Sequence, residues 1–197
     1  CPEEGARRQT LLGRLQPGQP VKAIPGAGTD VPIWLLGSGL YSAQLAAMRG
    51  LPYAFAGHFA PRLYREALRV YWDNFQPSEQ LQQPYAMLAI PAVPADSMEE
   101  ARFLSTTSYQ RILSLFRGQP LWMKPPVESM NGLWNAAEEA GVKDFLGLQV
   151  IGNADDLKQQ LEELLSDIQV EELMFTVDIY EPARRRHALD ILAQTRT

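Results

Sequence analysis

The sequence predicts an α/β protein with a parallel β-sheet, for two reasons. Short apolar runs with the length of buried strands alternate with longer segments whose apolar residues recur at helical spacing. This unit repeats four times, and parallel strands require a crossover, usually helical, between one strand and the next. The predicted strands are residues 33–36, 53–56, 85–93 and 173–177. Four parallel strands fit either an open sheet or half of an eight-stranded barrel, and periodicity alone does not separate the two.

The predicted helices begin and end at recognisable signals. Gly50 is placed to close the first helix, and Pro61 is a favoured first residue for the second. Ser97 and Glu100 match a capping box, and Asn153 can cap the penultimate helix. The strand at residues 33–36 reads as buried on both faces. The helices are predicted at residues 40–49, 61–75, 97–116, 131–140, 154–168 and 184–194.

Composition narrows the class of protein. The chain has 197 residues, of which 46% are hydrophobic and 21% charged, with a net charge of -5. These fractions are ordinary for a globular protein, and the negative charge argues against nucleic acid as a partner. No apolar run is long enough to cross a membrane, and a single cysteine suits a reducing cytoplasm, so we expect a cytoplasmic protein. Residues 1–32 are predicted to form an N-terminal segment with a Pro/Gly-rich connection, and residues 33–197 the α/β domain.

The turn after the first strand is the strongest local signal. Gly37, Ser38 and Gly39 lie between a predicted strand and the start of a helix, where free backbone N–H groups make an anion site. The glycines would let a phosphate approach the backbone, and Ser38 and Ser42 offer hydroxyl donors. The alternative is a tight strand-to-helix turn with a serine cap. Because position 42 is serine, the turn is not the dinucleotide fingerprint, which requires a third glycine.

His58 follows the second predicted strand, at the end where α/β folds place ligand-contacting residues. An imidazole there can hydrogen-bond a flavin, bind substrate or transfer a proton near neutral pH. The alternative is a structural hydrogen bond. His187 is the other histidine and lies in a basic segment near the end of the chain, so no metal site is predicted.

The sequence resembles the luciferase-like flavin monooxygenases, relatives of bacterial luciferase. The likeness is carried first by the string VPIWLLGSGLYSAQLAAMRGLPYAFAGHFAP at residues 31–61. It continues through the strings PYAMLAIPAVPADSMEEA, QVIGNADDLKQQL and EELMFTVDIYEPARRRHALDIL. It therefore covers nearly the whole chain.

The resemblance implies a TIM-type (β/α)8 barrel that binds reduced FMN at the carboxyl ends of its strands. A separate reductase typically supplies the reduced flavin, which reacts with O2 to oxidise a small organic substrate. On this resemblance Gly37, Ser38, Gly39 and Tyr41 fall on the turn that contacts flavin and phosphate. Ser42 lies beside that turn, and we assign it to cofactor binding as well. His58 falls at the flavin face and is the predicted catalytic residue.

The resemblance also implies that much of the family fold is absent from these 197 residues. The chain aligns with strands five to eight, so we expect it to pair with a complementary half-barrel or to form a homo-oligomer. Gly39 stands where the subgroup usually has serine, which removes a hydroxyl donor, and Gly57 is often serine too. Two alternatives stay open: a non-catalytic truncated relative that binds flavin or serves in assembly, and an oxidoreductase that uses the deazaflavin F420.

Overall fold

The structure is a computed structural model that describes Gly18, Thr29 and residues 31–195. Backbone proximity divides the chain into two units, Cys1–Ile33 and Trp34–Thr197. Most of the predicted N-terminal segment, residues 1–32, lies outside the described residues. The fold below is that of the second unit.

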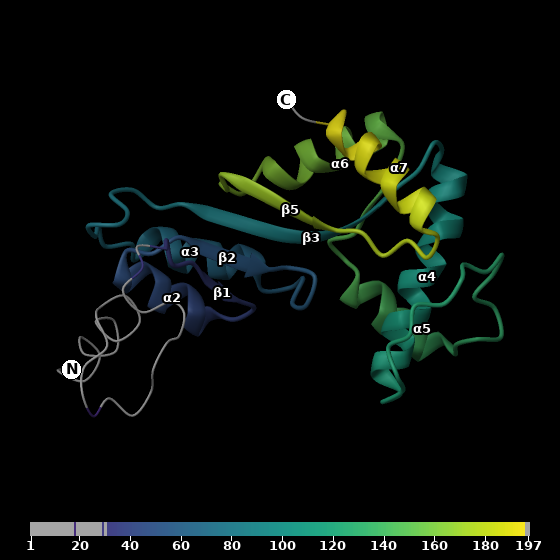
Figure 1. The fold of residues 1–197 in the computed structure, drawn as a ribbon. Coiled ribbons are helices and arrows are strands. Elements are labelled where there is room, and N and C mark those ends of the chain that lie inside the picture. Colours follow the sequence, from purple (N-terminus) through teal and green to yellow (C-terminus); the bar gives the residue numbers. More distant parts are fainter. Residues whose placement is uncertain (1–17, 19–28, 30, 196–197) are drawn as a thin grey trace. The chain divides into compact units, whose positions relative to one another are not determined.

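The second unit is built on a parallel sheet whose strands are joined by helices (Figure 1). Strands β1, β2, β3 and β5 lie side by side in that order, each parallel to its neighbour. The strands are β1 (Leu35–Gly37), β2 (Tyr53–Ala56), β3 (Ala86–Pro94), β4 (Val150–Gly152) and β5 (Glu172–Thr176). The helices are α2 (Leu40–Arg49), α3 (Tyr64–Asp73), α4 (Met98–Phe116), α5 (Ala136–Phe145), α6 (Ala154–Leu165) and α7 (Pro182–Ala193). The predicted parallel α/β fold is confirmed.

Strand β4 is an addition that the sequence did not reveal. Its three residues pair with the carboxyl end of β3, at Ala92–Pro94, beyond the stretch of β3 that pairs with β2. A run of three residues is too short to show the alternation of polar and apolar residues that marks a strand. Gly152, whose φ is 125°, weakens the strand pattern further. β4 delivers the chain to Asn153, whose side chain accepts hydrogen bonds from two backbone N–H groups of α6, as predicted.

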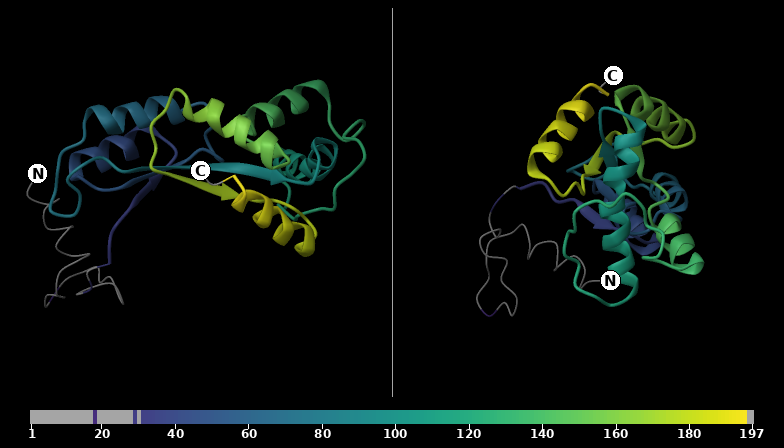
Figure 2. Two further views of the ribbon diagram at one scale, coloured as in Figure 1. Left: turned by 90° about the horizontal axis from the view of Figure 1, so that it is seen from above. Right: turned by 90° about the vertical axis from the view of Figure 1, so that its right-hand side faces the viewer.

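One face of the sheet carries the main hydrophobic core. Tyr53 and Phe55 of β2, together with Leu88 and Ile90 of β3, are fully buried against α2, α3 and α6. Figure 2 shows α3 and α6 on the same side of β3. Because strand residues alternate between faces, the side chains between them point to the other face.

The other face of the sheet is exposed to solvent at both edge strands, β1 and β5. Leu36 of β1 is 66% exposed and Met174 of β5 is 50% exposed. The prediction that the first strand is buried on both faces is therefore wrong. Among the described residues β1 pairs with β2 alone, so it is an edge strand. Its second face therefore has no covering layer there, and the apolar side chains on that face stay exposed.

Four helix starts differ from their predicted positions or caps, and α7 begins at Pro182, two residues before its predicted start. α3 begins at Tyr64, because residues 61–63 form a turn in which Leu63 N–H donates to the carbonyl of Ala60. α5 begins at Ala136, where Asn135 and Glu138 form a complete capping box, and not at residue 131. Ser97 caps α4 as predicted, but the Glu100 carboxylate accepts from the N–H of Asp96, so only one bond of the predicted capping box forms.

A helical excursion lies beyond the carboxyl end of β3 (Figures 1 and 2). It comprises α4, α5 and the Pro-rich segment between them. That segment is tied to α4 by side chains: Thr107 Oγ1 donates to the carbonyl of Lys124 at 3.0 Å, and Thr106 Oγ1 accepts from the N–H of Val127 at 2.9 Å. The excursion covers the same edge of the sheet to which the predicted site residues belong.

Candidate functional site

The turn between β1 and α2 is shaped by Gly37 and Ser42. A β-carbon built on Gly37 would collide with the Oγ and Cβ atoms of Ser42, so only glycine fits there without a shift. Ser42 Oγ donates to the carbonyl of Gly39 at 2.7 Å and lies 3.2 Å from the hydroxyl of Tyr53. The Ser42 hydroxyl therefore serves the turn itself, and its proton is already engaged.

The start of α2 has the features of an anion site. Gly39 is the N-cap residue, and its backbone is extended with no side chain capping the helix. A β-carbon on Gly39 would meet no atom within 4 Å, so the space beside it is open. Ser38 and Tyr41 are exposed at the same place. Uncapped N–H groups with the helix dipole behind them favour a negatively charged ligand.

His58 lies at the carboxyl end of β2, held close to β3. Its backbone N–H donates to the carbonyl of Ala89 at 3.1 Å. The preceding Gly57 is buried, and a β-carbon there would lie 2.7 Å from that same carbonyl oxygen. This close approach fixes the direction in which the His58 side chain leaves the strand.

The imidazole of His58 is half-buried, and its Nδ1 atom is buried without a hydrogen-bond partner among the described residues. Burial lowers the pKa of His58 below its ordinary value, because it disfavours the charged form. The nearby carbonyl of Ala89 and the carboxylate of Asp178 raise this pKa, and the guanidinium of Arg111 lowers it. The ring is therefore neutral near pH 7.

Arg111 and Asp178 are charged groups that the sequence analysis did not assign to the site. Arg111 Nη1 of α4 lies 2.8 Å from Asp178 Oδ2, which follows β5. A single arginine in a helix gives no signal by itself. The position of Asp178 just after a predicted strand was the available clue, because carboxyl ends of parallel strands meet at one edge of the sheet.

The predicted residues share one edge of the sheet but form two groups. Gly37 pairs with Phe55, three residues before His58, so the turn and the histidine follow neighbouring strands. Ser42 and Gly39 are joined by one hydrogen bond, whereas Tyr41 is 75% exposed. Within residues 31–195 no hydrogen bond joins the turn to His58.

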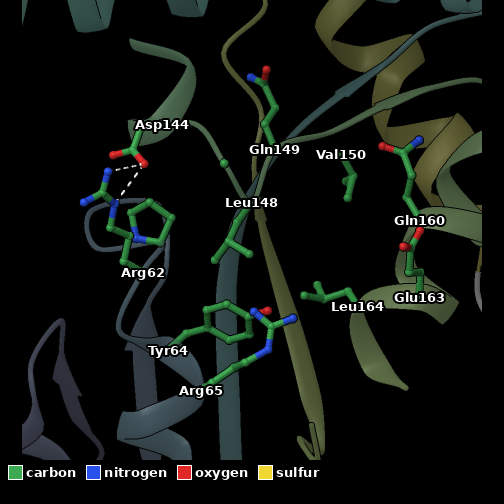
Figure 3. Close-up of a pocket in the computed structure, with 12 residues that line it drawn as sticks. Arg62, Tyr64, Arg65, Asp144, Leu148, Gln149, Val150, Gln160, Glu163 and Leu164 are labelled. Atoms are coloured by element: carbon green, nitrogen blue, oxygen red, sulfur yellow. Dashed lines mark hydrogen bonds and ion pairs between the residues drawn. The ribbon is translucent and has the colours of Figure 1, made fainter. Parts of the chain in front are cut away.

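A hollow that does not include these residues lies between the start of α3 and α6. A cavity of about 410 Å³ is lined by the segment before α3, the approach to β4 and one side of α6. Figure 3 shows the Arg62–Asp144 ion pair at one side of this cavity, and the side chains of Gln160 and Glu163 at the other. Neither Gly37–Ser42 nor His58 lines it, so the cavity is separate from the carboxyl-edge residues.

The described residues contain neither a metal-ligating cluster nor a membrane-spanning helix. No group of three or more His, Cys, Asp or Glu side chains there could hold a metal ion. None of the helices in that part of the chain is both long and apolar enough to cross a membrane.

Comparison with known proteins identifies the family. The model of the luciferase-like monooxygenase family matches residues 5–171. The chain belongs to this family. An uncharacterised Bacillus subtilis protein, YvbT, is 44% identical over 173 residues, which are 88% of this chain and 52% of that protein. A luciferase-like monooxygenase of Escherichia coli K12 is 39% identical over 175 residues, 89% of this chain and 52% of that protein.

A solved structure supports the fold. The chain matches apo-MsnO8 with a TM-score of 0.75 at 23% identity, covering 98% of this chain and 58% of that one. The fold class of this luciferase-like chain is thus that of TIM-barrel enzymes, as the sequence predicted. The chain spans about half the length of the curated relatives it matches.

Proposed function

We propose that this chain is part of an FMN-dependent luciferase-like monooxygenase and holds the phosphate of FMN at the turn between β1 and α2. One observation carries the proposal: the uncapped start of α2, with open space beside Gly39, belongs to a chain of this family. The backbone N–H groups of the first turn and the Ser38 hydroxyl would bind the phosphate. The Gly37–Ser42 contact keeps the turn in shape.

The flavin would supply the redox chemistry with O2 on a small organic substrate, and a separate reductase would reduce it. The protein's part is to orient the flavin and to keep water away from the reacting centre. His58, neutral and fixed by Gly57, would provide a polar contact on the flavin side of the carboxyl edge. We place the protein in the cytoplasm, in keeping with its single cysteine.

The fold does not distinguish FMN from F420 as the cofactor. The preference for FMN therefore rests on sequence similarity. The FMN complex of the oxygenating constituent of 3,6-diketocamphane monooxygenase matches with a TM-score of 0.56 at 17% identity, covering 91% of this chain and 52% of that one. A coenzyme F420 dependent tetrahydromethanopterin reductase also matches with a TM-score of 0.56, at 13% identity, covering 95% and 58%. The relative that is 39% identical is named a luciferase-like monooxygenase, which supports FMN.

We also propose that the open face of the sheet is covered in the working protein, by a complementary half-barrel or by a second copy. Exposed Leu36 and Met174 support this proposal, because apolar side chains on a sheet face are stabilised when another layer buries them. The second candidate function, a non-catalytic flavin-binding or assembly protein, uses the same turn and the same face.

The substitution Ser38→Glu tests the phosphate site. It places a carboxylate at the start of α2, where it would occupy the N–H groups and repel phosphate. We expect FMN affinity, measured by quenching of flavin fluorescence, to fall by about a hundredfold, or ~2.7 kcal/mol. Riboflavin, which lacks the phosphate, should bind wild type and variant with similar affinity.

Gln44→Glu is the matched control, because it adds the same charge on an exposed position of α2 away from the turn. It should leave FMN binding unchanged. Unaltered FMN affinity in Ser38→Glu would remove the phosphate site from this turn. FMN binding without oxygen consumption, when reduced FMN is supplied with an aldehyde and alkane panel to the assembled protein, would favour the non-catalytic alternative.

A further inference from the structure

The first two turns of α7 are joined to the rest of the fold by polar side chains. Three residues make these contacts, Arg184, Arg185 and His187, and together we call them the α7 clasp. Arg184 forms ion pairs with Glu100 of α4 and with Glu181, the N-cap residue of α7 itself. The clasp thus contacts α4 at its first turn.

Arg185 of the clasp holds the backbone that follows β5. Its guanidinium donates two hydrogen bonds to the carbonyl of Ile179, at 2.9 Å and 2.7 Å. One nitrogen of the same group also lies 3.4 Å from the Sδ atom of Met123, in the Pro-rich segment. A single side chain of α7 therefore contacts both the end of the sheet and the helical excursion.

His187 links α7 to the junction between β3 and α4. Its Nε2 atom lies 2.7 Å from the Oδ1 atom of Asp96, which directly precedes the N-cap residue of α4, Ser97. The two linked residues are 91 positions apart in the sequence. Their side chains are 53% and 71% exposed, so protons from solvent reach both.

The apolar packing of α7 is confined to its second half. Of its 12 residues the buried ones are Ala188, Ile191 and Leu192. Ala188 packs in a small cluster with Val93 and Ile179, and the other two join the main core. Because no residue of α7 before Ala188 is buried, its first two turns depend on the polar contacts of the clasp.

The carboxylates around His187 favour its charged form. The pKa of His187 lies above its ordinary value, first because of the hydrogen bond to Asp96 and then because of the negative charge of that carboxylate. Asp190 and Glu100 raise the pKa further, and the partial loss of water opposes them. The remaining charged side chains at this corner of the fold are exposed and belong to α7, α4 and the Pro-rich segment: Arg184, Arg186, Glu99, Arg102 and Glu128.

We propose that the α7 clasp is a pH-dependent fastening, in which protonated His187 holds α7 to the β3–α4 junction through Asp96. When His187 loses its proton, the first two turns of α7 loosen. Arg185 lies in the same turns, so the loosening extends to its contacts with Ile179 and Met123. The inference goes beyond the proposed function, because it involves neither a flavin nor the Gly37–Ser42 turn.

The direction of the pH dependence follows from linkage. A histidine whose pKa is raised in the folded chain binds its proton more tightly there than in the unfolded chain. The stability that it contributes is therefore fully present below the unfolded value of about 6.5 and is lost as the pH rises through the higher, folded value. The clasp is tight on the acidic side of this window and loose on the alkaline side.

NMR of the histidine rings tests the link between His187 and Asp96 in the full chain. Wild-type His187 should titrate above the ordinary value of about 6.5, and Asp96→Asn should bring its pKa back towards that value. His58 serves as the reference signal, because its pKa is lowered and Asp96 is not among the groups that act on it.

Hydrogen exchange of the α7 amides tests the fastening itself. Protection of Ala188, Ile191 and Leu192, corrected for the intrinsic effect of pH on exchange, is compared at about pH 6.5 and about pH 9. We expect wild-type protection to fall roughly threefold at the higher pH, the size typical of one exposed ion pair. His187→Gln and Asp96→Asn should each abolish this step.

The matched control is Asp144→Asn, which breaks another exposed ion pair, with Arg62, and should keep the wild-type step. Leu157 and Leu161 of α6 give the internal reference and should show no step. Absence of the step in wild type, or its persistence in both clasp variants, overturns the proposal. If one variant loses its fold by circular dichroism, the other still decides, because the two substitutions remove opposite partners of the same contact.

Discussion

Gly37 shows how a missing side chain decides the geometry of the predicted phosphate turn. Its backbone conformation is open to other residues, since its φ is not positive. What excludes a side chain is the Ser42 hydroxymethyl group, which occupies the place of the β-carbon. Gly39, two residues on, has no such neighbour. The two glycines of this turn therefore have different physical reasons to be glycine.

This difference predicts opposite effects on stability. Gly37→Ala should lower the free energy of unfolding by about 1–3 kcal/mol, because it forces Ser42 away from the carbonyl of Gly39. Gly39→Ser should raise it by a few tenths of a kcal/mol, roughly, because serine is a better N-cap than glycine and the space is open. Urea unfolding followed by circular dichroism measures both. Equal destabilisation by the two substitutions would contradict this account of the turn.

At the same scale, the placement of His58 was predictable but its chemical state was not. The residue follows a short buried strand, so its place at the carboxyl edge could be inferred from the sequence. Its neutral state depends on burial beside β3 and on Arg111, which is 53 residues further along the chain. Contacts of that range are not visible in local sequence patterns.

Among the elements, α3 is fixed to the sheet by Tyr71. The ring is fully buried, and its hydroxyl donates to the carbonyl of Leu51 at 2.9 Å while accepting from the N–H of Tyr85 at 3.0 Å. Leu51 precedes β2 and Tyr85 precedes β3, so one side chain sets the amino ends of two strands and the helix between them. Tyr71 lies in the segment predicted as a helix, residues 61–75, but helical spacing does not reveal this role.

Tyr71→Phe should therefore cost about 1–3 kcal/mol of stability, because it leaves a buried N–H and a buried carbonyl without their partner. Tyr180→Phe is the control, since Tyr180 is partly exposed and should change stability little. Thermal unfolding of the two variants checks this. If both variants match wild type, the Tyr71 hydroxyl does not hold the strand starts.

The same residue predicts a pH dependence. Burial raises the pKa of Tyr71 from 10.0 to about 12 in the folded chain. The unfolded chain loses the proton first, so the stability that Tyr71 contributes is present below about pH 10 and is lost as the pH rises towards 12. Tyr71→Phe should show a shallower loss of stability across that range, measured by urea unfolding at each pH.

The start of α5 shows where helix prediction from sequence reached its limit. Asn131 and Asn135 are both acceptable caps, and the choice depends on Glu138, which completes the capping box only with Asn135. Arg117 of the preceding segment also binds Glu138, at 2.8 Å, and so fixes the helix start against α4. The spacing of Asn135 and Glu138 is itself a sequence signal for a capping box, whereas the ion pair with Arg117 depends on the fold.

For the whole second unit, the open face of the sheet is the feature with the largest consequence. Four parallel strands carry helices on one face, while Leu36 and Met174 stand exposed on the other. Strands β1 and β5 each pair with one neighbour among the described residues. A parallel sheet of this kind is stable when both faces are covered.

We therefore expect the chain to associate through this face, with itself or with a complementary half-barrel. Leu36→Lys and Met174→Lys should each weaken association by about tenfold, from the lost burial of one large apolar side chain. Met48→Lys is the control, because Met48 is similarly exposed but lies on α2. Analytical ultracentrifugation measures the dissociation constant. Equal weakening by all three substitutions would show that the open face is not the interface.

The sequence by itself determined the strand–helix repeat, the parallel sheet, most helix boundaries and the family. The fold features follow from local signals, namely apolar spacing, glycine and proline punctuation, and caps, whereas the family follows from the resemblance of the longer strings. Only the tertiary structure decided which face of the first strand is buried, where β4 pairs, and that Arg111 of α4 pairs with Asp178. Those features depend on contacts between residues far apart in the chain, which are set by how the elements stack and not by the residues next to them in sequence.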